Sequence, residues 1–298
     1  MTDAILAGLL GSEPLSRRRV ERGYTPAERW VVALEDGRSV FVKSAVNDLT
    51  AGWLRDEHRL YSALEAPFMP RLLGWADGDR PTLILEDLSA AAWPPPWTDV
   101  RVASVLRTLR DVASTPPPSW LHPARISGLL ERGWQQVRDE PGPLLATGIV
   151  DGTWLDATLP ALREASDACE LDGDELLHLD VRSDNLCFRD GGSVVLVDWN
   201  LAVIGNARID VAFWLPTLVA EGGPIPESVL PDAGREAAFV SGFFAARAGQ
   251  PPIPGAPAIR PLQLEQLRHA LPWACRALSL PLPATVAGQR RLRSSAGP

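Results

Sequence analysis

The sequence predicts an α+β fold in which a small N-terminal antiparallel sheet carrying one helix precedes a larger, mainly helical C-terminal part. Short runs rich in β-branched and aromatic residues occur before residue 89, whereas apolar residues at helical spacing dominate the rest of the chain. Three consecutive prolines lie where one pattern replaces the other. We therefore expect an N-terminal lobe at 1–88, a Pro-rich hinge at 89–97 and a C-terminal lobe at 98–298.

The N-terminal lobe is expected to contain two pairs of strands. WVVAL at 30–34 and SVFVK at 39–43 are strand-like, and the Asp-Gly pair at 36–37 between them is a strong hairpin signal. RLLGWA at 71–76 and TLILEDL at 82–88 predict two further strands separated by a polar turn.

A helix is expected between these pairs, from Leu49 to Leu64. Its apolar residues recur at helical spacing, and Glu57 falls four residues from both Trp53 and Tyr61, inside the apolar stripe. A carboxylate on a stripe that faces the core needs a partner, because burying an unpaired charge is costly.

The C-terminal lobe is expected to be helical apart from one interruption. Helices are predicted at 98–114, 123–139, 153–169, 208–221, 226–248 and 257–279. Between 176 and 199 the runs LLHLD, NLCF and VVLVDW predict short strands, of which the last two form a tight hairpin around 189–193.

Composition narrows the class of protein. A net charge of -8 argues against nucleic-acid binding, which depends on basic side chains at phosphates. No apolar run is long enough for a membrane span, and the short AILAGLL at 4–10 lacks the basic flank of a signal peptide. The three cysteines are scattered and predict buried thiols in a reducing compartment. We expect a cytoplasmic enzyme or binding protein with no membrane or nucleic-acid partner; its oligomeric state is left open.

The basic residues contain one anomaly. The chain has 29 Lys and Arg residues, and Lys43 is the only lysine among them. A compact ammonium and a broad guanidinium are not interchangeable, so Lys43 indicates a site that requires lysine unless its retention is chance.

The strongest motif lies in HLDVRSDNLCF at 178–188. His178, Asp180 and Asn185 form the pattern H-x-D-x-x-x-x-N, and the predicted hairpin folds Asp198 back toward Asn185. A chance match to this spacing is expected only about 0.004 times in a chain of this composition. The pattern therefore indicates chemistry, the more so because Lys43 and a buried glutamate precede it.

On these residues the chain resembles the protein-kinase-like superfamily and, within it, the aminoglycoside phosphotransferase family. The resemblance covers nearly the whole chain. It implies a two-lobed protein-kinase-like fold and transfer of the γ-phosphoryl group of ATP or GTP to a hydroxyl of a small molecule. By this resemblance Asp180 orients and deprotonates the acceptor hydroxyl, and Asn185 and Asp198 hold Mg²⁺ on the phosphates, consistent with the hard oxygen ligands that this ion prefers.

The resemblance also assigns nucleotide contacts. Lys43 would neutralise the α- and β-phosphates, and Glu57 on the following helix would pair with it. Glu86 and Leu88 match the segment whose backbone hydrogen-bonds the adenine edge.

Three more residues receive roles by the same resemblance. Arg182 matches a position near the γ-phosphate and is assigned as catalytic together with Asp180, with a solvated loop arginine as the alternative. His178 is expected to support the catalytic loop through hydrogen bonds. Asp210 matches the aspartate that opens a helix and anchors the loop backbone.

Departures from the family pattern narrow these expectations. The stretch that should cover the phosphates, at 21–30, contains only Gly23 and no triple-glycine pattern. Only eleven residues separate Asp198 from Asp210, which leaves no room for an activation loop and favours a small-molecule acceptor over a protein.

The acceptor itself is left open between an aminoglycoside-type antibiotic and a sugar or amino-alcohol metabolite. The acidic run at 167–175 would attract an aminosugar, although such runs are more often solvated helix ends. Trp214 and Trp273 could stack on a sugar ring, although tryptophans in helices are usually core. The rival interpretations are a pseudokinase that binds without catalysis, a protein kinase, and a metal-dependent hydrolase with His178 and Asp180 as ligands.

Overall fold

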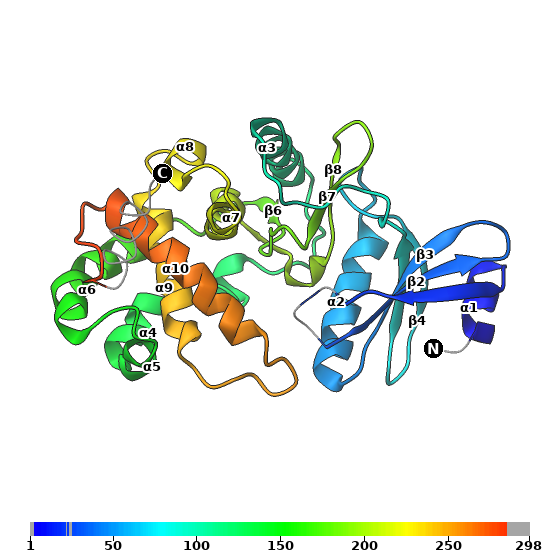
Figure 1. The fold of residues 1–298 in the computed structure, drawn as a ribbon, viewed down its shortest axis with the longest axis horizontal. Coiled ribbons are helices and arrows are strands. Elements are labelled where there is room, and N and C mark those ends of the chain that lie inside the picture. The colour runs from blue at the N-terminus through cyan, green and yellow to red at the C-terminus, as the bar shows by residue number, and fades with distance from the viewer. Residues whose placement is uncertain (1–2, 22, 24–25, 285–298) are drawn as a thin grey trace, which may run out of the picture. The chain divides into compact units, whose positions relative to one another are not determined.

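A computed structural model describes residues 3–21, 23 and 26–284 (Figure 1). The chain folds into two compact units. The first contains residues 1–121 and 175–204, and the second contains residues 122–174 and 205–298. The lobe boundaries expected from the sequence stay a prediction.

A five-stranded antiparallel sheet forms the centre of the first unit, with strand order β1-β2-β3-β5-β4. Its strands are β1 (Pro14–Arg19), β2 (Glu28–Leu34), β3 (Ser39–Ser44), β4 (Leu72–Ala76) and β5 (Thr82–Glu86). The predicted hairpin is confirmed as β2 and β3, and Gly37 adopts φ +86° in its turn. The edge strand β1 was not predicted, because PLSRRR has no alternation of apolar and polar residues.

The two faces of this sheet pack against different helices, as Figure 1 shows. One face contributes Val32, Val40 and Ile84 to a core that includes Leu6 of helix α1 (Asp3–Leu10). Residues directly opposite each other on neighbouring strands share a face. Lys43 alternates with the core residues of β3, so it projects from the opposite face, toward helix α2 (Asp48–Ala63).

Helix α2 confirms the predicted helix. It begins with a capping box in which the Asn47 side chain accepts from the backbone N–H of Thr50 and the Thr50 hydroxyl accepts from that of Asn47. Its buried stripe contains Leu54, Leu60 and the predicted Glu57. The stripe fixes the direction in which this carboxylate points.

The Pro-rich stretch after β5 leads to α3 (Asp99–Ala113) and is hydrogen-bonded to the segment 175–204. Ala92 and Phe188 exchange two backbone hydrogen bonds of 2.9 Å, and Leu88 packs with Cys187 and Val195. The segment 175–204 contributes β6 (Glu175–Leu177), β7 (Leu186–Phe188), β8 (Val194–Leu196), the 3₁₀ turn η2 (Trp199–Leu201) and most of β9 (Val203–Gly205). The predicted hairpin is confirmed as β7 and β8.

The second unit is helical. It contains η1 (Ala124–Ile126), α4 (Gly133–Asp139), α5 (Gly142–Ala146), α6 (Gly152–Asp167), α7 (Arg208–Ala220), α8 (Pro226–Val229), α9 (Gly234–Ala248) and α10 (Ile259–Ala277). Helix α9 packs against α4, α6, α7 and α10 and lies at the centre of the unit. Trp214 and Trp273 are 0% and 1% exposed, so they belong to the core and cannot stack on a sugar.

Two predicted helices are wrong in their extent. The prediction at 123–139 is divided into η1 and α4, because Gly128 adopts φ +73° between them. The prediction at 226–248 is divided into α8 and α9 at Pro231 and Asp232, where proline has no N–H to donate and Asp232 adopts φ +54°. The overall class, a small antiparallel sheet followed by a mainly helical part, is confirmed. None of the helices within the described ranges combines the length and apolar character that a bilayer span requires.

Candidate active site

Three predicted residues from distant parts of the chain meet on the α2 side of the sheet. The Nζ atom of Lys43 lies 2.7 Å from Oε2 of Glu57 and 2.7 Å from Oδ1 of Asp198. Lys43 and Glu57 are 7% and 1% exposed. Strand β3, helix α2 and the turn that follows β8 thus place one ammonium between two carboxylates, and the roles predicted for these three residues stay predictions.

The two carboxylates of this cluster differ in acidity. Burial alone would raise the pKa of Asp198, but the Lys43 charge outweighs it and leaves that pKa lowered. Burial raises the pKa of Glu57, and Lys43 offsets only part of this rise. Burial acts to lower the pKa of Lys43, but Asp198 and Glu57 together leave it raised. Glu57 is therefore the carboxylate that takes up a proton first as the pH falls.

His178 holds two backbone segments together. It is 0% exposed; its Nδ1 accepts from the backbone N–H of Asp180 at 3.2 Å, and its Nε2 donates to the carbonyl of Val197 at 3.0 Å. The ring also packs edge-on against Trp199, with centroids 4.5 Å apart. Burial lowers the pKa of His178 to about 4. Because both ring nitrogens are used on backbone, His178 is not placed as the metal ligand that a hydrolase would need.

The carboxylate of Asp180 is held from two sides. Nη2 of Arg182 and Nδ2 of Asn185 donate to its Oδ2 at 3.0 and 2.8 Å, and Nε of Arg182 lies 3.0 Å from Oδ1. Burial raises the pKa of Asp180, and the Arg182 charge opposes that rise. Arg182 also lies 3.4 Å from a carboxylate oxygen of Asp184. Its guanidinium thus lies between two carboxylates, and the role predicted for it at the γ-phosphate stays a prediction.

The donor set for a metal ion is present in Asn185 and Asp198. The amide nitrogen of Asn185 donates to Oδ2 and to the backbone carbonyl of Asp180, which leaves the amide oxygen for another partner. Asp198 uses Oδ1 on Lys43. An amide oxygen and a carboxylate oxygen are hard donors of the kind that Mg²⁺ takes together with phosphate and water. The residues therefore fit the predicted ion by chemistry.

Two non-glycine residues of this site have a left-handed backbone. Leu179, between His178 and Asp180, adopts φ +62°, and Asp198 adopts φ +69°. This conformation is uncommon for a bulky residue and persists only where surrounding contacts impose it. Such strain is concentrated at functional sites, and here it falls on Asp198 and on the residue directly before Asp180.

The predicted nucleotide-edge residues lie where β5 enters the hinge. Oε2 of Glu86 accepts from Nη2 of Arg189 at 2.8 Å, so this side chain has a structural partner. The carbonyl of Leu88 accepts from the backbone N–H of Ala91, whereas its own N–H has no hydrogen-bond partner within the described ranges. That N–H is a donor of the type that an adenine edge needs.

Asp210 is buried in the first turn of α7, in the second unit, with 3% of its surface exposed. The anchoring role predicted for it stays a prediction.

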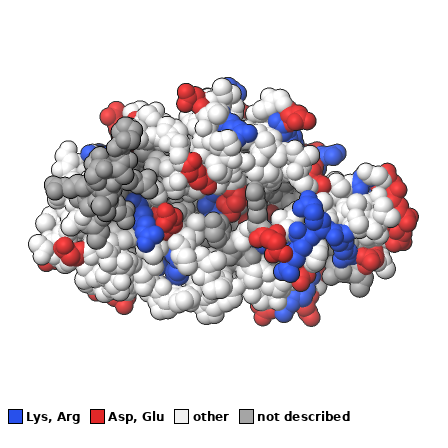
Figure 2. Space-filling view, in the orientation of Figure 1, with Lys and Arg blue, Asp and Glu red and all other residues white. Residues whose placement is uncertain are grey.

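A group of basic side chains lies beside acidic ones on the surface over the N-terminal sheet (Figure 2). Figure 2 shows Lys and Arg side chains gathered there, and β1 contributes the exposed Arg17, Arg18 and Arg19. Charges on an edge strand discourage pairing with another chain, which is sufficient reason for them. These arginines also make the local electrostatic potential more positive, which favours the approach of an anionic ligand.

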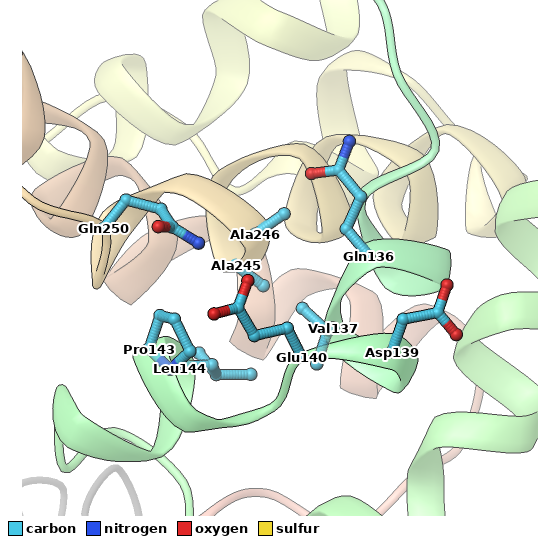
Figure 3. A pocket seen from close by; sticks show the side chains of 9 residues that line it. All are labelled: Gln136, Val137, Asp139, Glu140, Pro143, Leu144, Ala245, Ala246 and Gln250. Atoms are coloured by element: carbon cyan, nitrogen blue, oxygen red, sulfur yellow. The ribbon is translucent and has the colours of Figure 1, made fainter.

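A pocket of about 290 Å³ lies in the second unit between α4, α5 and the end of α9 (Figure 3). Its floor is apolar, with Val137, Leu144 and Ala245, and the exposed Asp139 and Glu140 stand at its rim. None of the described residues that line it is basic, so these residues offer no cation to a phosphate. We assign it no part in phosphoryl transfer.

Comparison with protein families gives a match to the phosphotransferase enzyme family over residues 16–248. The chain belongs to this family. The match covers nearly all of the sheet, the segment 175–204 and most helices of the second unit, and the resemblance expected from the sequence is confirmed. A search of curated proteins found no match.

Solved structures of this phosphotransferase family share the fold. Aminoglycoside phosphotransferase APH(4)-Ia, in a ternary complex with ADP and hygromycin B, aligns with a TM-score of 0.59 at 14% identity and covers 100% of this chain and 99% of that one. An aminoglycoside phosphotransferase from Alicyclobacillus acidocaldarius gives 0.52 at 16% identity, covering 97% and 96%. Choline kinase LicA from Streptococcus pneumoniae gives 0.55 at 11% identity, covering 92% and 97%. At these identities the likeness shows the fold, which is the predicted kinase-like one.

Sequence reasoning missed one residue beside this cluster. Arg29 on β2 pairs in register with Lys43 and acts electrostatically on Glu57 and Asp198. The register of the predicted hairpin contained the signal, because a three-residue turn centred on Asp36 sets Arg29 opposite Lys43.

Proposed function

We propose that this phosphotransferase moves the γ-phosphoryl group of ATP or GTP to a hydroxyl group of a small molecule. The observation that supports the proposal most strongly is the position of Nζ of Lys43, 2.7 Å from both Glu57 and Asp198. A buried ammonium fixed by two carboxylates suits a site that holds phosphate oxygens at a defined position.

Nucleotide binding is assigned to groups of the first unit. Lys43 contacts the phosphates, and the N–H of Leu88, which has no partner among the described residues, donates to the base edge. Asn185 and Asp198 would hold Mg²⁺, which when bound neutralises charge on the β- and γ-phosphates. Glu57 keeps the Lys43 side chain extended toward the ligand.

Asp180 is assigned as the proton acceptor. The acceptor hydroxyl attacks the γ-phosphorus, its proton passes to the Asp180 carboxylate, and the bond from that phosphorus to the bridging oxygen breaks with release of ADP or GDP. Arg182 opposes the effect of burial and favours the ionised form that can take the proton. Asn185 and Arg182 both fix the orientation of this carboxylate through hydrogen bonds.

A small acceptor is favoured over a protein. Only eleven residues separate Asp198 from Asp210, so the chain lacks the long segment on which protein kinases dock peptides. The similar proteins are named for aminoglycosides and choline, which are hydroxylated cations. We propose an aminoglycoside-type antibiotic, a sugar or an amino alcohol as the class of acceptor, with no nucleic-acid partner and a cytoplasmic location.

The pseudokinase alternative requires a site that binds nucleotide without transfer. It is disfavoured because Lys43, Asp180, Asn185 and Asp198 are all present and the Asp180 carboxylate is oriented by two donors. A binding module has no need for an oriented proton acceptor.

The test is transfer of labelled γ-phosphate from ATP and from GTP to a library of hydroxylated antibiotics and metabolites. The wild type and Asp180→Asn are compared, with Asp190→Asn as the matched control, because Asp190 is exposed in the β7–β8 turn. We expect the wild type and the control to label an acceptor, and Asp180→Asn to bind nucleotide while losing turnover by orders of magnitude. Full turnover by Asp180→Asn, or labelling of peptides alone, would contradict the proposal.

A further inference from the structure

A second cation stands beside Lys43 on the same face of the sheet. Arg29 of β2 is the direct cross-strand partner of Lys43, and Leu83 of β5 is its partner on the other side. Because opposite residues of antiparallel strands share a face, the half-buried Arg29 projects toward the side where Glu57 and Asp198 lie.

The charges confirm this placement. The guanidinium of Arg29 acts electrostatically on Lys43, Glu57 and Asp198, the three members of the cluster. Two like charges in directly opposed positions destabilise a sheet. Glu57 and Asp198 offset the two cations here, and without Arg29 the remaining three groups would carry a net negative charge that repels a phosphate.

Gly23, in the stretch between β1 and β2, lies against the guanidinium of Arg29. Gly23 adopts φ +110°, and a β-carbon on it would lie 2.9 Å from Cζ of Arg29. Nη1 of Arg29 donates to the carbonyl of Ala27 at 2.9 Å, and the carbonyl of Arg29 accepts from the N–H of Val20 at the base of the loop. Arg29 thus lies against the loop that in protein kinases covers the phosphates.

This loop lacks what makes it effective in protein kinases. A glycine-rich loop binds phosphate through closely approaching backbone N–H groups, and the stretch 21–30 contains Gly23 as its one glycine. A guanidinium offers five donors in a planar fork that matches phosphate oxygens. Arg29 supplies from a side chain what the missing glycines would supply from the backbone.

We propose that Arg29 is the second phosphate-binding cation of this enzyme. From its position opposite Lys43, it binds the terminal phosphates of the nucleoside triphosphate. The inference rests on the proposed function, since it names a further residue of the same nucleotide site. A purely structural arginine would only hold the loop, so the test must separate phosphate recognition from folding.

The experiment measures binding of a non-hydrolysable nucleoside triphosphate with Mg²⁺, and of the matching nucleoside, by titration calorimetry. The variants are Arg29→Met, Arg29→Lys and the control Arg19→Met. Arg19 lies on β1 opposite Trp30, on the other face of the sheet, so its loss changes net charge equally without reaching Lys43. Thermal unfolding of each variant checks the fold.

We expect Arg29→Met to weaken triphosphate binding about 10- to 100-fold, as loss of a charge-assisted hydrogen bond does, with nucleoside binding unchanged. Arg29→Lys should lie between Arg29→Met and the wild type, and Arg19→Met should match the wild type. Equal triphosphate affinity in Arg29→Met and the wild type, or equal losses for triphosphate and nucleoside, would overturn the inference and leave the proposed function standing. A wild type that binds no triphosphate would overturn the proposed function itself.

Discussion

Replacing Lys43 by methionine keeps the length of the side chain and removes the charge that Glu57 and Asp198 share. Glu57 is 1% exposed, so water cannot take the place of the ammonium. Removing one partner of a buried ion pair typically costs about 3–5 kcal/mol, because the remaining charge is left uncompensated. We expect the free energy of unfolding of Lys43→Met to fall by that amount at neutral pH.

The second replacement, Glu57→Gln, should repair part of this loss. Glutamine has nearly the same shape as glutamate and removes the buried charge at position 57, whereas Asp198 stays without its partner, so the double variant should be about 2 kcal/mol more stable than Lys43→Met. Because burial raises the pKa of Glu57, protonation relieves the orphan charge. The penalty in Lys43→Met should therefore shrink as the pH falls and grow as the pH rises through that pKa.

Urea unfolding followed by tryptophan fluorescence measures these differences. Arg55→Met is the matched control, because Arg55 forms an exposed ion pair with Asp77 at 3.2 Å and such pairs contribute about 0–1 kcal/mol. Lys43→Met and the double variant should both lack phosphoryl transfer, which separates stability from function. A loss below about 1 kcal/mol in Lys43→Met, or a double variant no more stable than it, would refute the reasoning.

Other expectations follow from the same contacts. Burial lowers the pKa of His178 from 6.5 to about 4, so the free energy of unfolding should fall by up to about 3 kcal/mol as the pH drops from 6.5 to about 4. Urea unfolding midpoints measured across this pH range check the prediction. His178→Asn should make the free energy of unfolding less dependent on pH in this range. Gly133→Ala places a β-carbon 1.9 Å from the carbonyl oxygen of Gly242, so it should lower the free energy of unfolding by about 1–3 kcal/mol. Gly152→Ala is the control, because a β-carbon there has no neighbour within 4 Å and should leave the stability unchanged. Thermal unfolding of both variants measures the difference. Turnover should fall at acidic pH, because burial raises the pKa of Asp180 above 3.8 and only its ionised form accepts a proton; the pH profile of kcat/KM tests this.

Much of the N-terminal sheet could be predicted, because its signals are local. The hairpin of β2 and β3 follows from an Asp-Gly turn between apolar runs, and α2 follows from its 3.6-residue periodicity. Strand β1 could not be predicted in this way, because an exposed edge strand made of PLSRRR buries no apolar side chain. The strand is held in place by its backbone pairing with β2 and not by a pattern in its own residues.

The candidate site was predictable where residue type and spacing coincide. Lys43 stood out by scarcity, Glu57 by its place in an apolar stripe, and Asp180 by the spacing of its motif. The pairing of Arg182 with Asp180 was not predictable, because several rotamers of a long side chain are compatible with one sequence. Arg29 was predictable in principle from strand register.

The extent of two helices depended on single residues. Periodicity continues across Gly128 and across Pro231 and Asp232, so the pattern predicted one helix in each case. Packing around α9 decides where the chain turns, and such tertiary contacts are absent from a periodicity argument.

The central claim is that Lys43, Asn185 and Asp198 assemble a site for a nucleoside triphosphate and its Mg²⁺. Calorimetric affinity for a non-hydrolysable triphosphate, measured with Mg²⁺ and with a chelator, tests it most directly in the wild type and in Asp198→Asn. We expect Mg²⁺ to tighten triphosphate binding to the wild type and to have little effect on binding to the variant. Wild-type affinity that does not depend on Mg²⁺, or an unchanged dependence in Asp198→Asn, would contradict it.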